Sequence, residues 1–191
     1  MTAPPGVSLR IVPISSVDLE PVAALVNRAF GRYSELFKGQ RTSPRDYRDE
    51  AGDEARVILI EEGGTLVATG MVAAAERFAE PDQLGPAGTE RPTAPPALPP
   101  SHPWVGALYF GLAGVEPALM NRGFGRLMVA YVEQLAAGEG WGKVALGTVR
   151  EFGLVDYYEK LHYTVFHEET HPAGHWDFVV PHHYCEMVKH L

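Results

Sequence analysis

The stretch LAGVEPALMNRGFGRLM, residues 112–128, says most about the fold of this chain. It continues an apolar run, Trp104–Pro117, of the kind expected for a strand buried on both faces. It leads into Gly123–Gly140, where apolar residues recur at helical spacing. Gly123 and Gly125 stand where that helix begins. Backbone N–H groups converge on anions at such a turn, so the stretch predicts a strand, a phosphate-binding loop and a helix.

Two common nucleotide-binding loops do not fit this stretch. A Walker A loop needs G-x-x-x-x-G-K-[ST], and no segment of the chain has that pattern. A Rossmann fingerprint needs three glycines, and Met128 occupies the place of the third. The third glycine lets the helix pack closely on the strand, so dinucleotide binding is disfavoured. A plain structural turn is the remaining alternative for two glycines taken alone.

A second motif follows in LGTVREFGLVDYYEKLHY, residues 146–163. Together the two motifs resemble the GNAT superfamily of acyl-CoA-dependent N-acetyltransferases. That signature is an apolar strand and Q/R-x-x-G-x-G/A opening a helix, then a later helix reading F-Y-x-K/R-x-G-F/Y. The resemblance covers Trp104 to Tyr163, roughly a third of the chain, with two departures. Met120 stands at the Q/R position, and His162 stands where glycine is usual.

The remaining sequence extends the resemblance through the order of its elements. The predicted order is β-α-α-β-β-loop-β-α-β-α-β-β. The resemblance implies an α/β (α+β) fold with a mixed, mostly antiparallel sheet of six to seven strands flanked by helices. We predict a single domain over residues 1–191, with a Pro-rich loop insertion at 79–103 that holds eight of the 16 prolines.

Predicted strands cover Leu9–Ile14, Val57–Ile60, Leu66–Val72, Trp104–Pro117, Lys143–Val149, Tyr163–Glu169 and His182–Leu191. Predicted helices cover Val17–Arg32, Ser43–Ala55, Gly123–Gly140 and Leu154–Leu161.

Composition narrows the class of protein. The formal net charge is −8, which argues against nucleic-acid binding and is compatible with a cationic substrate such as an amine. No apolar run approaches the roughly 20 residues of a membrane span. The chain start lacks a secretory pattern, and a single cysteine, Cys185, suits a reducing compartment, so we expect a cytoplasmic protein with no membrane partner.

The resemblance also implies roles for individual residues. The pantetheine arm of acetyl-CoA would pair with the end of the fourth strand at Ala113, Gly114 and Val115. Its pyrophosphate would lie on the loop made of Met120, Asn121, Arg122, Gly123, Phe124, Gly125 and Arg126. Tyr158 would be the general acid that protonates the departing thiolate, since a phenol is still protonated at neutral pH.

The general base stays open between several candidates. The predicted fourth strand holds no acid, so the choice lies between Glu76, Tyr109, His102 and a water relay. Histidines gather beyond residue 160, but no cysteine pair or acidic partner completes a metal site, and we predict no metal. Aromatic residues that are candidates for lining an acceptor site are Phe30, Tyr33, Phe37, Phe78 and Trp176.

These observations predict an N-acetyltransferase that moves the acetyl group of acetyl-CoA to a primary amine by direct attack on the thioester. We expect the amine to belong to a small molecule. The alternatives are acetylation of a protein N-terminus or lysine, and an acyl-CoA-binding regulatory module without turnover. A homodimer is common in families of this kind, although no segment of the sequence identifies an interface.

Overall fold

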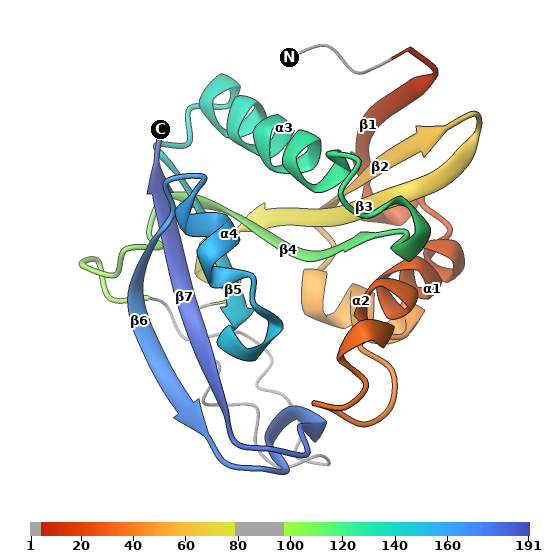
Figure 1. Ribbon diagram of the computed structural model, residues 1–191. Helices are drawn as coiled ribbons and strands as arrows, with labels where there is room; N and C mark the ends of the chain where they lie inside the picture. The colour runs from red at the N-terminus through yellow and green to blue at the C-terminus, as the bar shows by residue number, and fades with distance from the viewer. Residues whose placement is uncertain (1–4, 79–97) are drawn as a thin grey trace.

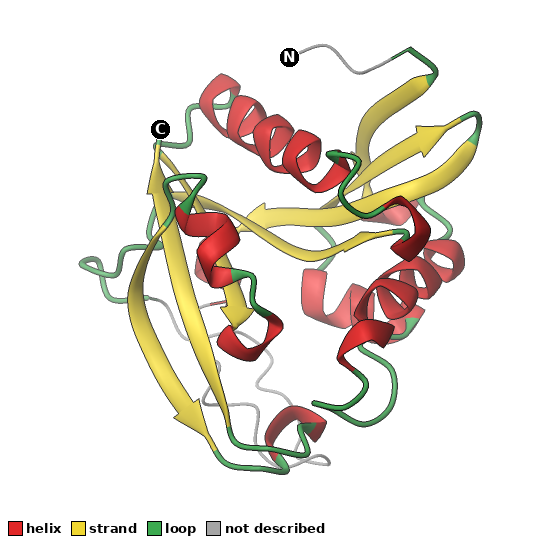
Figure 2. Cartoon of the chain, in the orientation of Figure 1, coloured by secondary structure: helices red, strands yellow, loops and turns green. Residues whose placement is uncertain are grey.

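The computed structural model describes residues 5–78 and 98–191 (Figures 1 and 2). The predicted Pro-rich insertion at 79–103 therefore lies mostly outside the described residues. Its last six positions, 98–103, are loop and turn, as a proline-rich segment should be.

One seven-stranded sheet forms the centre of the structure. The strand order is β1-β2-β3-β4-β5-β7-β6, and every neighbouring pair is antiparallel except β4 and β5. This confirms the predicted mixed, mostly antiparallel sheet. The strands are β1 (Val7–Pro13), β2 (Arg56–Glu62), β3 (Thr65–Ala74), β4 (Ala107–Val115), β5 (Lys143–Val149), β6 (Thr164–His171) and β7 (His182–His190).

In the described part of the chain, four α-helices connect these strands in the predicted order. They are α1 (Leu19–Phe30), α2 (Pro44–Ala51), α3 (Phe124–Gly138) and α4 (Val155–Glu159). Asp18 caps α1 by accepting from the Glu20 N–H, and Ser43 caps α2 by accepting from the Asp46 N–H. Helix α3 differs, because its N-cap is Gly123 and no side chain caps it.

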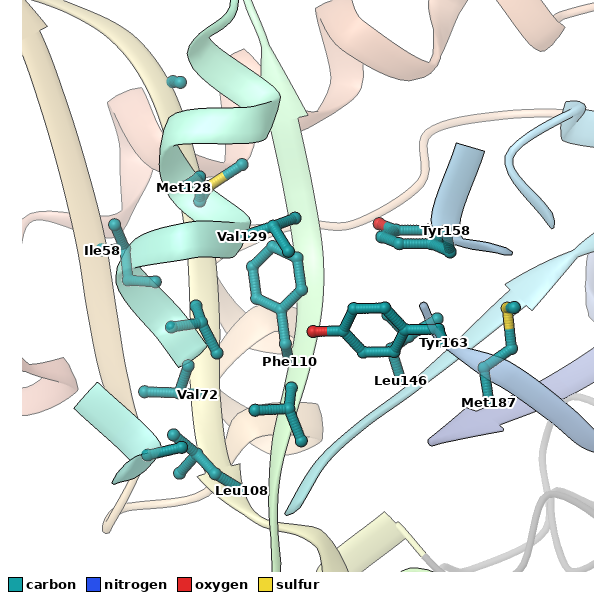
Figure 3. Close-up of a cluster of buried hydrophobic side chains, with 14 of the residues drawn as sticks. Ile58, Val72, Leu108, Phe110, Met128, Val129, Leu146, Tyr158, Tyr163 and Met187 are labelled. Atoms are coloured by element: carbon teal, nitrogen blue, oxygen red, sulfur yellow. The ribbon is translucent and has the colours of Figure 1, made fainter. Parts of the chain in front are cut away.

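The two faces of the sheet carry different helices. Ala107 and Tyr109 of β4 lie in the core shared with α1 and α2, whereas Leu108 and Phe110 lie in the core shared with α3. Figure 1 shows α1 and α2 on one side of β4 and α3 on the other. Figure 3 shows side chains of the second core, with Met128 and Val129 of α3 beside Phe110. The apolar run of β4 is thus explained by burial on both faces.

Strands β4 and β5 pair over a short distance only. Their ladder joins Ala107 to Lys143, Leu108 to Val144 and Tyr109 to Ala145, and no further pair follows. Figure 1 shows the two strands diverging beyond that point. The sheet is therefore split at its centre.

A β-bulge bends β4 just where the split opens. The β3–β4 register shifts between Thr69 and Met71, and Leu112 on β4 has a left-handed φ of 45°. Gly114, next to the bulge, allows a close approach of α1. A Cβ at Gly114 would lie 3.2 Å from both the Ala29 Cβ and the Val26 Cα, so α1 packs directly on the backbone there.

Candidate active site

The start of α3 offers unpaired backbone donors beside the split in the sheet. The N–H groups of Phe124, Gly125 and Arg126 lie in the first turn, where an α-helix has no internal acceptors for them. Gly123 has a left-handed φ of 89°, and a Cβ built on it would meet no atom within 4 Å. The loop is thus open to an anion along its backbone.

Tyr157 points its hydroxyl at this loop. The hydroxyl oxygen lies 3.6 Å from the position of a Cβ on Gly125. It is buried and has no hydrogen-bond partner among the described residues. Burial raises the pKa of Tyr157, so the phenol keeps its proton and can donate it in a hydrogen bond.

The predicted loop arginines differ in their surroundings. Arg122 makes a two-armed ion pair with Glu62 at 3.0 and 2.8 Å and lies over the Phe124 ring. Its charge is therefore already balanced by a carboxylate 60 residues away in sequence. Arg126 is exposed and makes no ion pair with any described residue. The predicted contact between Arg122 and the cofactor would have to compete with Glu62.

Met120 and Asn121 complete the loop. The Met120 sulfur accepts a weak hydrogen bond from Arg32 Nη1 at 3.4 Å, and Arg32 lies just after α1. Asn121 is exposed and has a left-handed φ of 65°, a conformation that asparagine tolerates better than most residues. The loop from Met120 to Arg126 thus forms one continuous turn into α3.

Tyr158 follows Tyr157 on α4 and lies in the same core as α3, with the two rings meeting edge to face at 5.2 Å. Its side chain is buried, and burial, followed by the neighbouring Tyr157, Tyr109 and Tyr33, raises its pKa. Figure 3 shows its ring beside that of Tyr163, with both hydroxyls directed toward β4. A protonated phenol directed at the β4 side of the split is suited to donate a proton there. The Tyr157 and Tyr158 side chains point in different directions because adjacent residues are turned about 100° apart on a helix.

Two tyrosines cover the split from the α1 and α2 side. The Tyr109 ring lies over Gly111 of its own strand, and the Tyr184 ring lies over Gly147 of β5. Their hydroxyls share a hydrogen bond, and Tyr109 also bonds the Gly147 backbone. Burial, reinforced by the charge of Glu50, raises the pKa of Tyr109, so it is protonated at neutral pH. Glycine in both strands is what allows these close approaches.

The structure places the three side-chain candidates for the base in different settings. Glu76 accepts a hydrogen bond from the Gly106 N–H at 2.7 Å, which gives it a structural role in the turn before β4. His102 accepts from the Trp104 N–H through Nδ1 at 3.2 Å, and burial lowers its pKa, so it is neutral at pH 7. Tyr109 is occupied by the hydrogen bonds with Tyr184 and Gly147.

Glu186 is a buried carboxylate that was not identified from the sequence. Its side chain is 5% exposed, and its Oε2 lies 3.7 Å from His102 Nε2. It faces the same side of β7 as Tyr184, two residues away, and its Cα pairs with that of Gly147. The signal was present in the sequence, since a polar residue at an inward position of an apolar strand marks a special site.

Most of the predicted aromatic residues gather near the end of α1. Tyr33 stacks on Phe152 at 4.3 Å, and its hydroxyl donates to the Phe152 carbonyl at 3.1 Å. Phe78 instead stacks on Tyr109 at 4.0 Å, under the split. The aromatic cluster at the end of α1 consists of Phe30, Tyr33, Phe37, Phe152 and Phe178.

The histidines gather at the far end of β6 and β7. His171 and His175 stack at 4.1 Å, His182 stacks on Phe178 at 3.8 Å, and Trp176 lies against all three histidines. Within residues 5–78 and 98–191, no group of three His, Cys, Asp or Glu side chains is arranged to hold a metal ion.

Comparisons with known proteins show which fold this chain shares. A scan of protein-family models finds no match, and neither does a search of curated proteins. Solved structures match over nearly the whole chain. A GCN5-related N-acetyltransferase from Kribbella flavida is 16% identical, with a TM-score of 0.60 over 99% of this chain and 100% of that one. An acyl-CoA N-acyltransferase from Pseudomonas aeruginosa is 14% identical, with a TM-score of 0.60 over 94% and 98%.

A third neighbour was solved with its cofactor. The Salmonella typhimurium protein yncA, determined with acetyl-CoA, is 13% identical, with a TM-score of 0.59 over 97% of this chain and 94% of that one. The chain therefore has the GNAT fold of acyl-CoA-dependent N-acetyltransferases. No helix in the described part of the chain is long and apolar enough to cross a bilayer.

Proposed function

We propose that this chain is an N-acetyltransferase that transfers the acetyl group of acetyl-CoA to a primary amine of a small molecule. The observation that carries the proposal is the coincidence of three features at one place. These are the end of β4–β5 pairing at Tyr109, the uncapped start of α3 at Gly123, and the Tyr158 hydroxyl directed toward β4. The fold shared with acetyltransferases supports the same reading.

The residues fit acetyl-CoA in the following way. The free N–H groups of Phe124, Gly125 and Arg126 and the unpaired Tyr157 hydroxyl suit the pyrophosphate. The β4 backbone from Ala113 to Val115, which lacks a partner strand on the β5 side, suits the amides of pantetheine. The acetyl group then lies near the split, within reach of an amine from the α1 and α2 side.

The chemistry at the split is direct transfer. A neutral amine attacks the thioester carbonyl, the carbon–sulfur bond breaks, and Tyr158 gives its proton to the departing thiolate. Burial keeps the Tyr158 phenol protonated, so it can act as that donor. The attacking nitrogen then loses its surplus proton through water to the Tyr158 phenolate, which restores the phenol and leaves the neutral amide and the CoA thiol. The ammonium proton leaves to a base before attack, through Glu186 or a water relay.

Charge and shape favour a small amine as the acceptor. The chain has a net charge of −8, and a buried carboxylate, Glu186, lies on the side of the sheet from which the amine would come. The aromatic cluster at the end of α1 would suit an acceptor with apolar parts. A single buried thiol, Cys185, fits a reducing cytoplasm, where we place the protein in this proposal.

Turnover with acetyl-CoA and a panel of small amines, followed by release of free CoA thiol, tests the proposal. Tyr158→Phe keeps the ring and the packing, and should lower kcat by about 10²-fold or more with unchanged affinity for acetyl-CoA. An unchanged rate in Tyr158→Phe would remove the general-acid role. Thiol release with peptides alone would favour a protein acceptor, and tight CoA binding without release for any amine would favour a non-catalytic module.

A further inference from the structure

The loop that starts α3 lacks a polar side chain at its first position. The related motif has glutamine or arginine there, and this chain has Met120. A thioether is only a weak acceptor and donates no hydrogen bond, so Met120 gives nothing to a phosphate. The structure brings another residue to the same place.

Arg32, which lies just after α1, reaches Met120 across 88 residues of sequence. Its Nη1 lies 3.4 Å from the Met120 sulfur. A guanidinium has five N–H donors in a planar fork, so this weak contact leaves most of them available. The Arg32 side chain also lies over the Tyr33 ring, at 5.1 Å, which limits the directions it can take.

Arg28 and Arg122 are already paired with carboxylates, whereas Arg32 is not. Arg28, one turn earlier on α1, makes a two-pronged bond to Glu116 at 3.0 and 2.9 Å. Arg122 is held by Glu62. Among the residues the structure describes, no carboxylate lies within ion-pair distance of Arg32. Its charge is therefore available to a ligand on the loop.

We propose that Arg32 binds the pyrophosphate of acyl-CoA across Met120, in place of the polar residue that the loop lacks. This rests on the proposed function, which puts acyl-CoA on the α3 start. A pyrophosphate diester carries two negative charges. The α3 N–H groups and the Tyr157 hydroxyl would bond one side of it, and the planar fork of Arg32 would pair with the other.

Binding measurements with a ligand series test this assignment. CoA, dephospho-CoA and pantetheine share the pantetheine arm, but only the first two carry the pyrophosphate and only the first carries the 3′-phosphate. Arg32→Gln should weaken CoA and dephospho-CoA equally, by about tenfold, and leave pantetheine unchanged. The loss should shrink in high salt, because Arg32 is exposed.

Arg28→Gln is the matched control on the same helix. It removes the same charge, but that charge is already paired with Glu116, so CoA affinity should stay within about twofold of the wild type. Arg32→Lys should lie between the wild type and Arg32→Gln, because lysine keeps the charge without the fork.

Several results would overturn the assignment. They are an unchanged affinity of Arg32→Gln for CoA, an equal loss for pantetheine, or a loss for CoA that vanishes with dephospho-CoA. Gly125→Trp separates these from failure of the proposed function, because it fills the loop itself. If Gly125→Trp abolishes CoA binding and Arg32→Gln does not weaken it, only the role of Arg32 fails. If the wild type does not bind CoA, the proposed function fails.

Discussion

Gly147 on β5 has no room for a side chain, because Tyr184 fills the space. A Cβ at this position would lie 1.8 Å from the Tyr184 hydroxyl oxygen and 2.4 Å from its Cζ. Gly147→Ala therefore forces the Tyr184 ring out of its place and breaks its hydrogen bond with Tyr109. The φ of Gly147 is not left-handed, so alanine meets no backbone strain there.

The expected cost follows from these contacts. Displacing a packed ring costs about 1–3 kcal/mol, and the lost hydrogen bond costs about 1 kcal/mol. Replacing a strand glycine by alanine returns about 0.5–1 kcal/mol by reducing the freedom of the unfolded chain. We expect Gly147→Ala to lower the free energy of unfolding by about 2 kcal/mol, a shift of about 1 M in the urea midpoint.

A double-mutant cycle gives the decisive measurement. In a Tyr184→Ala background the obstructing ring is gone, so Gly147→Ala should be neutral or stabilise the protein by up to about 1 kcal/mol. The coupling between the two positions should therefore be about 2–3 kcal/mol. If the two changes add to within about 0.5 kcal/mol, Tyr184 does not lie over Gly147 and the reasoning about the split is wrong.

Two further predictions concern positions away from the split. His162 is exposed and holds a left-handed φ of 70°, so His162→Gly should raise the free energy of unfolding by about 0.5–1 kcal/mol; His162→Ala keeps the strain, and an equal gain from it would contradict this explanation. Burial, followed by the charges of His171 and His175, lowers the pKa of His182 in the folded protein. In the unfolded chain this imidazole takes up a proton near pH 6.5, so protons bind the unfolded state more readily than the folded one. Stability should be full above that pH and fall as the pH drops below it. His182→Leu should flatten the pH dependence of the thermal midpoint and His190→Gln, an exposed control, should not; equal slopes in all three proteins would refute the assignment.

Much of the fold could be predicted because its signals are local. The apolar run of β4 needs burial on both faces, and the glycine pair at 123 and 125 lies between that run and the helical pattern of α3. Ser43 and Pro44 likewise predict the start of α2, because a cap and a first-turn proline are adjacent in the sequence. The predicted order of the elements was therefore correct. The observed ends of the elements differ from the predicted ends by a few residues, because fraying and capping decide where an element ends.

The residues of the candidate site could be predicted only where they belong to a motif within one segment of the sequence. Tyr158 follows from its motif, although its role as an acid stays a prediction. Arg32, by contrast, meets Met120 from 88 positions away. Glu62 reaches Arg122 from 60 positions away and competes for a residue that sequence reasoning had assigned to the cofactor. Such pairings depend on strand register and helix placement, which no pattern within one segment contains.

The short ladder between β4 and β5 has a mechanical consequence. In the described part of the chain, the ladder between β1–β4 and the β5–β7–β6 half of the sheet has only three residue pairs, so few main-chain hydrogen bonds hold the sheet together along this line. A ligand whose amides pair with β4 beyond Tyr109 would add main-chain hydrogen bonds along this line. Amide hydrogens from Phe110 to Val115 should then exchange more slowly when the ligand is bound. Binding of the ligand would thus also make the centre of the sheet more rigid.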